Sequence, residues 1–169
     1  MRSWSRAIRS RAALVRAARA RGDLRLFLHS FCFALSLRAL QRLPLPRLEA
    51  LLEPSAAPAR ARPADRERIA ASVLAMLEAG RPLVRSGCLT RGLTLYYFLR
   101  RAGEDVALCF GMGRADGGDG FDGHCWVTLD GEPYLERRDP RPLYVEMYSF
   151  GRRRAQEGSG APAPCRTAP

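Results

Sequence analysis

The sequence predicts an α+β fold, in which N-terminal helices precede a core made of a cysteine-bearing helix packed on a small antiparallel sheet. Apolar residues recur at helical spacing in several segments up to residue 101. Beyond residue 103, short apolar runs separated by glycine-rich turns are typical of strands. The last predicted helix opens with Cys88, and a His-x-Trp run in a predicted hairpin begins at His124.

The N-terminal half is predicted to be helical. Residues 1–22 form a basic arm rich in arginine and alanine, and helices are expected over 23–43, 47–53 and 65–77. Three prolines and several alanines make 54–63 a linker. The domain organisation that follows is an arm (1–22), a helical region with its linker (23–63), a core (64–150) and a disordered tail (151–169).

The most apolar stretch of the chain, residues 24–40, predicts a buried helix rather than one that lies on a membrane surface. Arg25, His29 and Arg38 interrupt it, and it falls short of the ~20 residues that a membrane-spanning helix needs. Five cysteines, an odd number without a C-x-x-C spacing, favour reduced thiols and a cytoplasmic protein. Of these, Cys32 and Cys109 lie in apolar runs and are expected in the core.

The C-terminal half carries the predicted sheet. Helix 88–101 has a buried face and ends before Gly103, which suits a left-handed C-cap. The strands are expected in the order 106–112, 121–129, 132–136 and 143–150, with a flexible loop at 113–120.

The chain is strongly basic, with a formal net charge of +11 and 28 basic residues that are all arginine. Such a charge suits a nucleic-acid or membrane-surface partner. The arginines are spread along the chain and gather at its ends, which favours codon bias as the explanation of the charge. No RNP-like or zinc-finger motif is present. We therefore expect no specific nucleic-acid partner, and only a weak membrane-surface contact through the arginine-rich N-terminus.

Cys88 is the candidate nucleophile. A helix N-terminus favours the thiolate over the thiol, and Arg85 or Arg91 could add to this effect. The alternative is a small buried core residue, which most free cysteines are. His124 on a strand is the candidate base, and alternation places it with Trp126 on one face and Cys125 on the other. Because Cys125 faces away from His124, a zinc site built from these residues is disfavoured, and no metal is expected.

A third group usually orients the imidazole, and the candidates are Glu136, Asp139 and Asp130. A two-residue turn at Asp130-Gly131 would place Glu136 opposite Cys125, on the wrong face. A three-residue turn with a glycine bulge would pair Thr128 with Glu132 and place Glu136 opposite His124. We favour the second register and Glu136, whereas Asp130 suits a turn and Asp139 a loop.

These residues resemble the transglutaminase-like cysteine peptidases of lasso-peptide biosynthesis, the microcin-processing B proteins in their stand-alone leader-peptidase form. The resemblance is carried by Cys-Leu-Thr-Arg-Gly-Leu-Thr-Leu from Cys88, the Leu-Arg-Arg-Ala-Gly that follows, and His-Cys-Trp-Val-Thr-Leu-Asp-Gly from His124. It covers about residues 65–137. It implies a papain-like core, Cys88 as nucleophile and His124 as base, and it places Glu136 where the family usually has Asp.

The resemblance further implies cleavage of the leader from a ribosomally synthesised precursor. The implied partners are that leader, a separate leader-recognition protein and an asparagine-synthetase-like cyclase. No cofactor is expected, since the run 117–120 lacks the lysine and helix of a phosphate-binding loop. Three hypotheses compete with the peptidase: a non-catalytic precursor chaperone of the same fold, an arginine-rich nucleic-acid or membrane-surface protein, and a transglutaminase that uses an amine acceptor.

Overall fold

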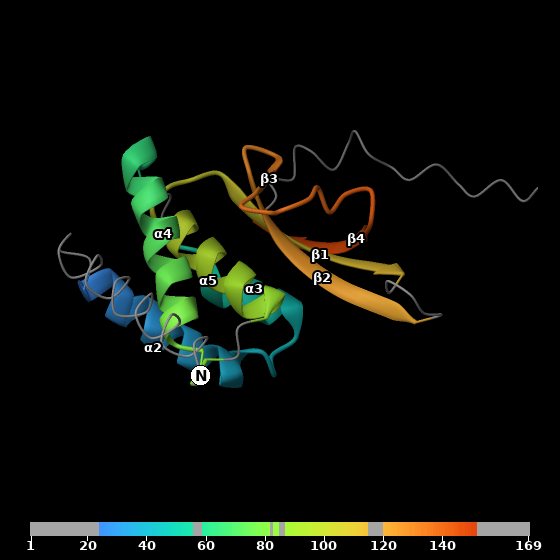
Figure 1. The fold of residues 1–169 in the computed structure, drawn as a ribbon, viewed down its shortest axis with the longest axis horizontal. Helices are drawn as coiled ribbons and strands as arrows, with labels where there is room; N and C mark the ends of the chain where they lie inside the picture. The colour runs from blue at the N-terminus through green and yellow to red at the C-terminus, as the bar shows by residue number, and fades with distance from the viewer. Residues whose placement is uncertain (1–23, 56–58, 82, 85–86, 115–119, 152–169) are drawn as a thin grey trace, which may run out of the picture.

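The fold is that of a computed structural model, which describes residues 24–55, 59–81, 83–84, 87–114 and 120–151. The described residues form four helices, α2 (Leu24–Leu40), α3 (Leu45–Leu52), α4 (Pro63–Ala79) and α5 (Cys88–Arg101). Four strands follow, β1 (Val106–Arg114), β2 (Phe121–Leu129), β3 (Glu132–Tyr134) and β4 (Val145–Phe150). Figure 1 shows the helices gathered on one side of the sheet, which confirms the predicted α+β fold.

The central helix is α5, which spans the predicted residues 88–101. Its side chains Leu93, Tyr96 and Leu99 are fully buried, and they belong to one apolar core shared with α2, α3, α4 and the sheet. Gly103 has a φ of 80°, the left-handed conformation expected after this helix. The division between a helical region at 23–63 and a core at 64–150 stays a prediction, although one apolar cluster joins the two segments.

The helix α2 buries only one face, so the expectation of a buried helix is met in part. Ser30, Ala34 and Leu37 are buried, whereas Leu28 and Cys32 lie exposed on the other side. The prediction that Cys32 belongs to the core was therefore wrong: an apolar run longer than its buried stripe has to leave some of its members in solvent. No helix among the described residues is both long and apolar enough to cross a membrane.

The four strands form an antiparallel sheet in the order β3-β2-β1-β4. The hairpin between β2 and β3 pairs Leu129 with Glu132, so the favoured register was wrong. Asp130 and Gly131 have φ values of 50° and 88°, as a type I′ turn requires. Hairpins favour this two-residue turn because its twist matches the twist of the two strands. The strand β3 ends at Tyr134, two residues earlier than predicted, because Leu135 leaves the extended conformation with a φ of 60°.

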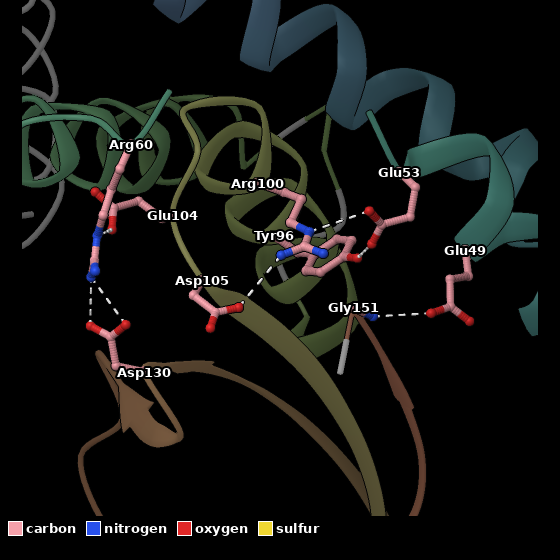
Figure 2. Close-up of polar contacts among 9 residues, drawn as sticks. All are labelled: Glu49, Glu53, Arg60, Tyr96, Arg100, Glu104, Asp105, Asp130 and Gly151. Atoms are coloured by element: carbon pink, nitrogen blue, oxygen red, sulfur yellow. Dashed lines mark hydrogen bonds and ion pairs between the residues drawn. The ribbon is translucent and has the colours of Figure 1, made fainter. Parts of the chain in front are cut away.

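Polar contacts tie the helices to the ends of the sheet (Figure 2). The carboxylate of Glu49 on α3 accepts hydrogen bonds from the Tyr148 hydroxyl of β4 and from the Gly151 N–H directly after this strand. The neighbouring Glu53 accepts from Tyr96 and Arg100 of α5. These contacts hold α5 in a fixed position against the sheet. The N-terminus of α5, which is the end opposite Arg100, lies beside β2.

Several sequence predictions concern residues outside the described ranges, among them the arm at 1–22, the tail from 152 and most of the loop at 113–120. Cys109 is fully buried, as expected.

Candidate active site

Cys88 is the first residue of α5, directly after the N-cap residue Gly87. Gly87 is extended and no side chain caps the helix, and the first backbone hydrogen bond of the helix runs from the Arg91 N–H to the Gly87 carbonyl. The N–H groups of the first turn have no partner within the helix, and they carry its positive dipole end. A negative charge on Cys88 is therefore favoured by its position.

The neighbours of Cys88 favour the thiolate further. Hydrogen bonds from the Cys125 thiol and backbone and from His124 lower the pKa of Cys88 to about 5, against partial burial, which raises it. The same contact with Cys88, together with burial, raises the pKa of Cys125, so that Cys125 stays a neutral donor. A thiolate is the reactive form of cysteine, and Cys88 holds it at neutral pH.

The free edge of β2 explains how one thiol meets both His124 and Cys125. The Asp130 N–H donates to the Asp105 carbonyl next to β1, so even-numbered residues of β2 direct their backbone groups toward β1. Odd-numbered residues, Cys125 included, direct theirs toward β3, which pairs only with residues 127–129. Cys88 lies at this uncovered edge, where the backbone of Cys125 is its donor and the side chains of both residues lie within reach.

His124 is held by aromatic rings and by a carboxylate. Its imidazole stacks on Trp126 at 6.1 Å between ring centroids, and Tyr144 covers it at 5.1 Å. The Nε2 atom lies 3.4 Å from Oε2 of Glu136, at the long end of a hydrogen bond. With Nε2 facing Glu136, Nδ1 is the ring nitrogen available to Cys88.

Glu136 reaches His124 although the register is the one in which a regular strand would have turned it away. The left-handed backbone at Leu135 ends the alternation of β3 and reorients the next residue. Arg91 holds this conformation, since its guanidinium donates to the Leu135 carbonyl and, at 2.9 Å, to Oε1 of Glu136. Each Glu136 oxygen therefore has its own partner, Arg91 on one side and His124 on the other.

The other two acidic candidates have other partners. Asp130 lies in the turn and binds Arg60 with both carboxylate oxygens, at 2.8 and 3.0 Å. Asp139 binds Arg141 at 2.7 Å, and this contact lowers the pKa of Asp139. The structure thus brings together Cys88, His124 and Glu136, and their catalytic roles stay a prediction.

An open cleft of about 690 Å³ borders His124 and Glu136. Arg91, Arg137, Arg138 and Tyr144 also line it. Cys88 and Cys125 line a smaller crevice next to it, which shares Arg91 and Glu136 with the cleft. The cleft therefore opens onto His124 and Glu136, and Cys88 lies in the adjoining crevice.

Two contributors to the site were missed or undervalued from the sequence. Arg91 was considered only as a charge near Cys88, although its position one turn along α5 places both on one helix face. Cys125 was set aside because it alternates with His124. Among the described residues, no group of three or more His, Cys, Asp or Glu side chains could hold a metal ion.

A helix-borne cysteine, a strand-borne histidine and a carboxylate behind it define a cysteine-nucleophile type of site. A family model described as the transglutaminase-like superfamily matches residues 27–149, and the chain belongs to that superfamily. The match includes most of α2 and all of α3 as well as nearly all of the predicted core. No curated protein and no solved structure shows significant similarity to the chain.

Proposed function

We propose that this protein is a cysteine peptidase that removes the leader peptide from a ribosomally synthesised lasso-peptide precursor. The observation that carries the proposal is the thiolate-favouring environment of Cys88 next to His124, whose far side meets Glu136. Membership of a superfamily that includes cysteine peptidases supports the reaction class. The resemblance of the segments around Cys88 and His124 to lasso-peptide B proteins supports the substrate.

The reaction follows from the positions of these groups. The Cys88 thiolate attacks the carbonyl carbon at the leader–core junction, and N–H groups of the first turn of α5 stabilise the oxyanion. His124, which takes up the proton of the Cys88 thiol, gives this proton to the departing amine as the carbon–nitrogen bond breaks. Water then attacks the thioester, His124 takes its proton, and the leader leaves with a new carboxylate. Glu136 and Arg91 keep the imidazole in place through both steps.

We assign leader recognition to a separate small protein and macrolactam closure to an asparagine-synthetase-like cyclase. In the part of the chain that the structure describes, all four strands belong to one sheet, the one that carries the partners of Cys88. These strands therefore form no second sheet that could serve as a leader-recognition domain. The cleft beside His124 has room for an extended segment of the precursor.

Mass spectrometry of a candidate precursor, mixed with this protein and the leader-recognition partner, tests the proposal. Wild type is expected to release the leader, Cys88→Ala and His124→Ala to release none, and Glu136→Gln to release it more slowly. Cys32→Ser is the matched control, because this cysteine is exposed on α2 and lies outside the site. Release of the leader by Cys88→Ala would refute the proposal.

The same assay with an added primary amine separates hydrolysis from acyl transfer. An uncleaved precursor that gains the amine and loses ammonia from a glutamine side chain would indicate a transglutaminase, which is the alternative enzyme of this superfamily. Binding of the precursor without release, unchanged in Cys88→Ala, would indicate a precursor chaperone. Either result would refute the proposal that this protein is a peptidase.

A further inference from the structure

Cys125 is a buried thiol that the proposed reaction does not need. The residue is 5% exposed, and its thiol interacts with Cys88, whose thiolate it stabilises. Gly92, one turn after Cys88 on α5, packs directly on Cys125, since a Cβ atom at this position would lie 3.4 Å from the Cys125 Sγ, an ordinary contact distance. The two thiols line one crevice and are held between a helix and a strand.

The other described cysteines are placed elsewhere. Cys109 pairs with Trp126 across β1 and β2, so its side chain points to the face of the sheet opposite Cys125. Cys32 is exposed on α2. Among the described residues, Cys88 and Cys125 are therefore the two cysteines that lie together at the candidate site.

The two members of the pair differ in the way that a reactive and a resolving cysteine differ. Cys88 is a partly exposed thiolate and is thus the first target of an oxidant. Cys125 is protonated and shielded, so that it reacts only with what forms on Cys88. A resolving thiol next to a sulfenic acid forms a disulfide before further oxidation occurs.

We propose that a hydroperoxide converts Cys88 and Cys125 into a reversible intramolecular disulfide, which switches the site off and protects its nucleophile. The Cys88 thiolate attacks the peroxide, becomes a sulfenic acid and releases hydroxide. The Cys125 thiol then displaces water from that sulfenic acid as the sulfur–sulfur bond forms. Overall, with hydrogen peroxide as the oxidant, the two thiols lose two electrons and two protons and the peroxide becomes two waters. A dithiol reductant restores both thiols.

The inference shares Cys88 with the proposed function but depends only on the contact between the two thiols. Its test therefore needs no substrate. Purified, reduced protein is treated with hydrogen peroxide, excess oxidant is removed, and intact mass and non-reduced peptide maps are recorded. Wild type is expected to lose two hydrogen atoms, to show a peptide that joins residues 88 and 125, and to recover fully in dithiothreitol.

The matched variant is Cys125→Ser, which keeps the size and the donor but not the sulfur. It is expected to gain two oxygen atoms at Cys88 and to stay oxidised in dithiothreitol, since a sulfinic acid resists thiols. Cys109→Ser and Cys32→Ser should behave as wild type, with circular dichroism confirming that each variant is folded.

Two results would overturn the inference. One is a wild-type protein that gains oxygen at Cys88 at the same peroxide dose as Cys125→Ser. The other is a disulfide that joins Cys88 to a different cysteine or to a second molecule. A protein that forms the expected disulfide but cleaves no precursor would refute the proposed function and leave this inference standing.

Discussion

Replacement of Cys125 should change the pH at which Cys88 reacts. In wild type the pKa of Cys88 is about 5, and a hydrogen bond from the Cys125 thiol is the largest cause of that lowering. At pH 5.5 a group with this pKa is about three-quarters thiolate, whereas an ordinary cysteine with a pKa of about 8.5 is about 0.1% thiolate. Cys125→Ala removes the thiol donor, so the pKa of Cys88 should rise by about one unit or more.

The shape of the pH profile, rather than the rate at one pH, carries this prediction. A thiolate of lower pKa is also a weaker nucleophile, so a gain in thiolate fraction at pH 7 is partly cancelled. The midpoint of the rise in rate has no such cancellation. Because the pKa of Cys88 is lowered, the wild-type rate should rise through about pH 5 and stay level above pH 6.

The assay is iodoacetamide alkylation of Cys88, followed by peptide mass spectrometry from pH 4 to pH 9. Cys125→Ala should move the midpoint upward, and Cys125→Ser, which retains a hydroxyl donor, should move it less. A wild-type midpoint near pH 8.5 would refute the claim that the site holds a thiolate. Equal midpoints for wild type and Cys125→Ala, with a large shift in His124→Ala, would show that the imidazole and not the thiol sets the pKa.

Two further predictions concern α5. Arg91→Ala frees Glu136, and because loss of alignment at a reacting group is costly, kcat for precursor cleavage should fall about tenfold or more at a temperature where the variant is folded. The melting temperature should fall as well, since Leu135 and Glu136 lose their shared partner. Arg91→Lys, which cannot hold both the Leu135 carbonyl and the carboxylate, should recover little of this loss. Gly92→Ala places a Cβ atom 2.7 Å from a methyl carbon of Leu108, so urea unfolding should show a loss of about 1–3 kcal/mol. Gly123→Ala, which meets open space, should stay within about 0.5 kcal/mol of wild type.

The helices and strands were predictable because their apolar residues repeat with a clear period. Helix 88–101 and strand 121–129 have the predicted bounds, and together they carry the nucleophile, the base and Cys125. Short β3 was predicted too long, since three paired residues leave little periodicity to judge. The local pattern thus located Cys88 and His124 on their elements, while their contact depends on tertiary packing.

The hairpin shows why part of the site lay beyond sequence reasoning. The Asp-Gly sequence strongly favours a two-residue turn. The longer turn was favoured only because it brought Glu136 to His124. The structure has the short turn and brings Glu136 to His124 by other means. Nothing about a leucine predicts the left-handed backbone of Leu135, which is sterically unfavourable for a residue with a branched side chain.

That backbone conformation connects the acid to the helix that bears the nucleophile. Arg91 lies one turn from Cys88, and it binds both the carbonyl of Leu135 and the carboxylate of Glu136. The unfavourable φ of Leu135 is compensated by this pair of charge-assisted contacts. Because α5 therefore positions Cys88 directly and Glu136 through Arg91, a movement of the helix displaces nucleophile and acid together, and His124 is the member that the sheet fixes independently.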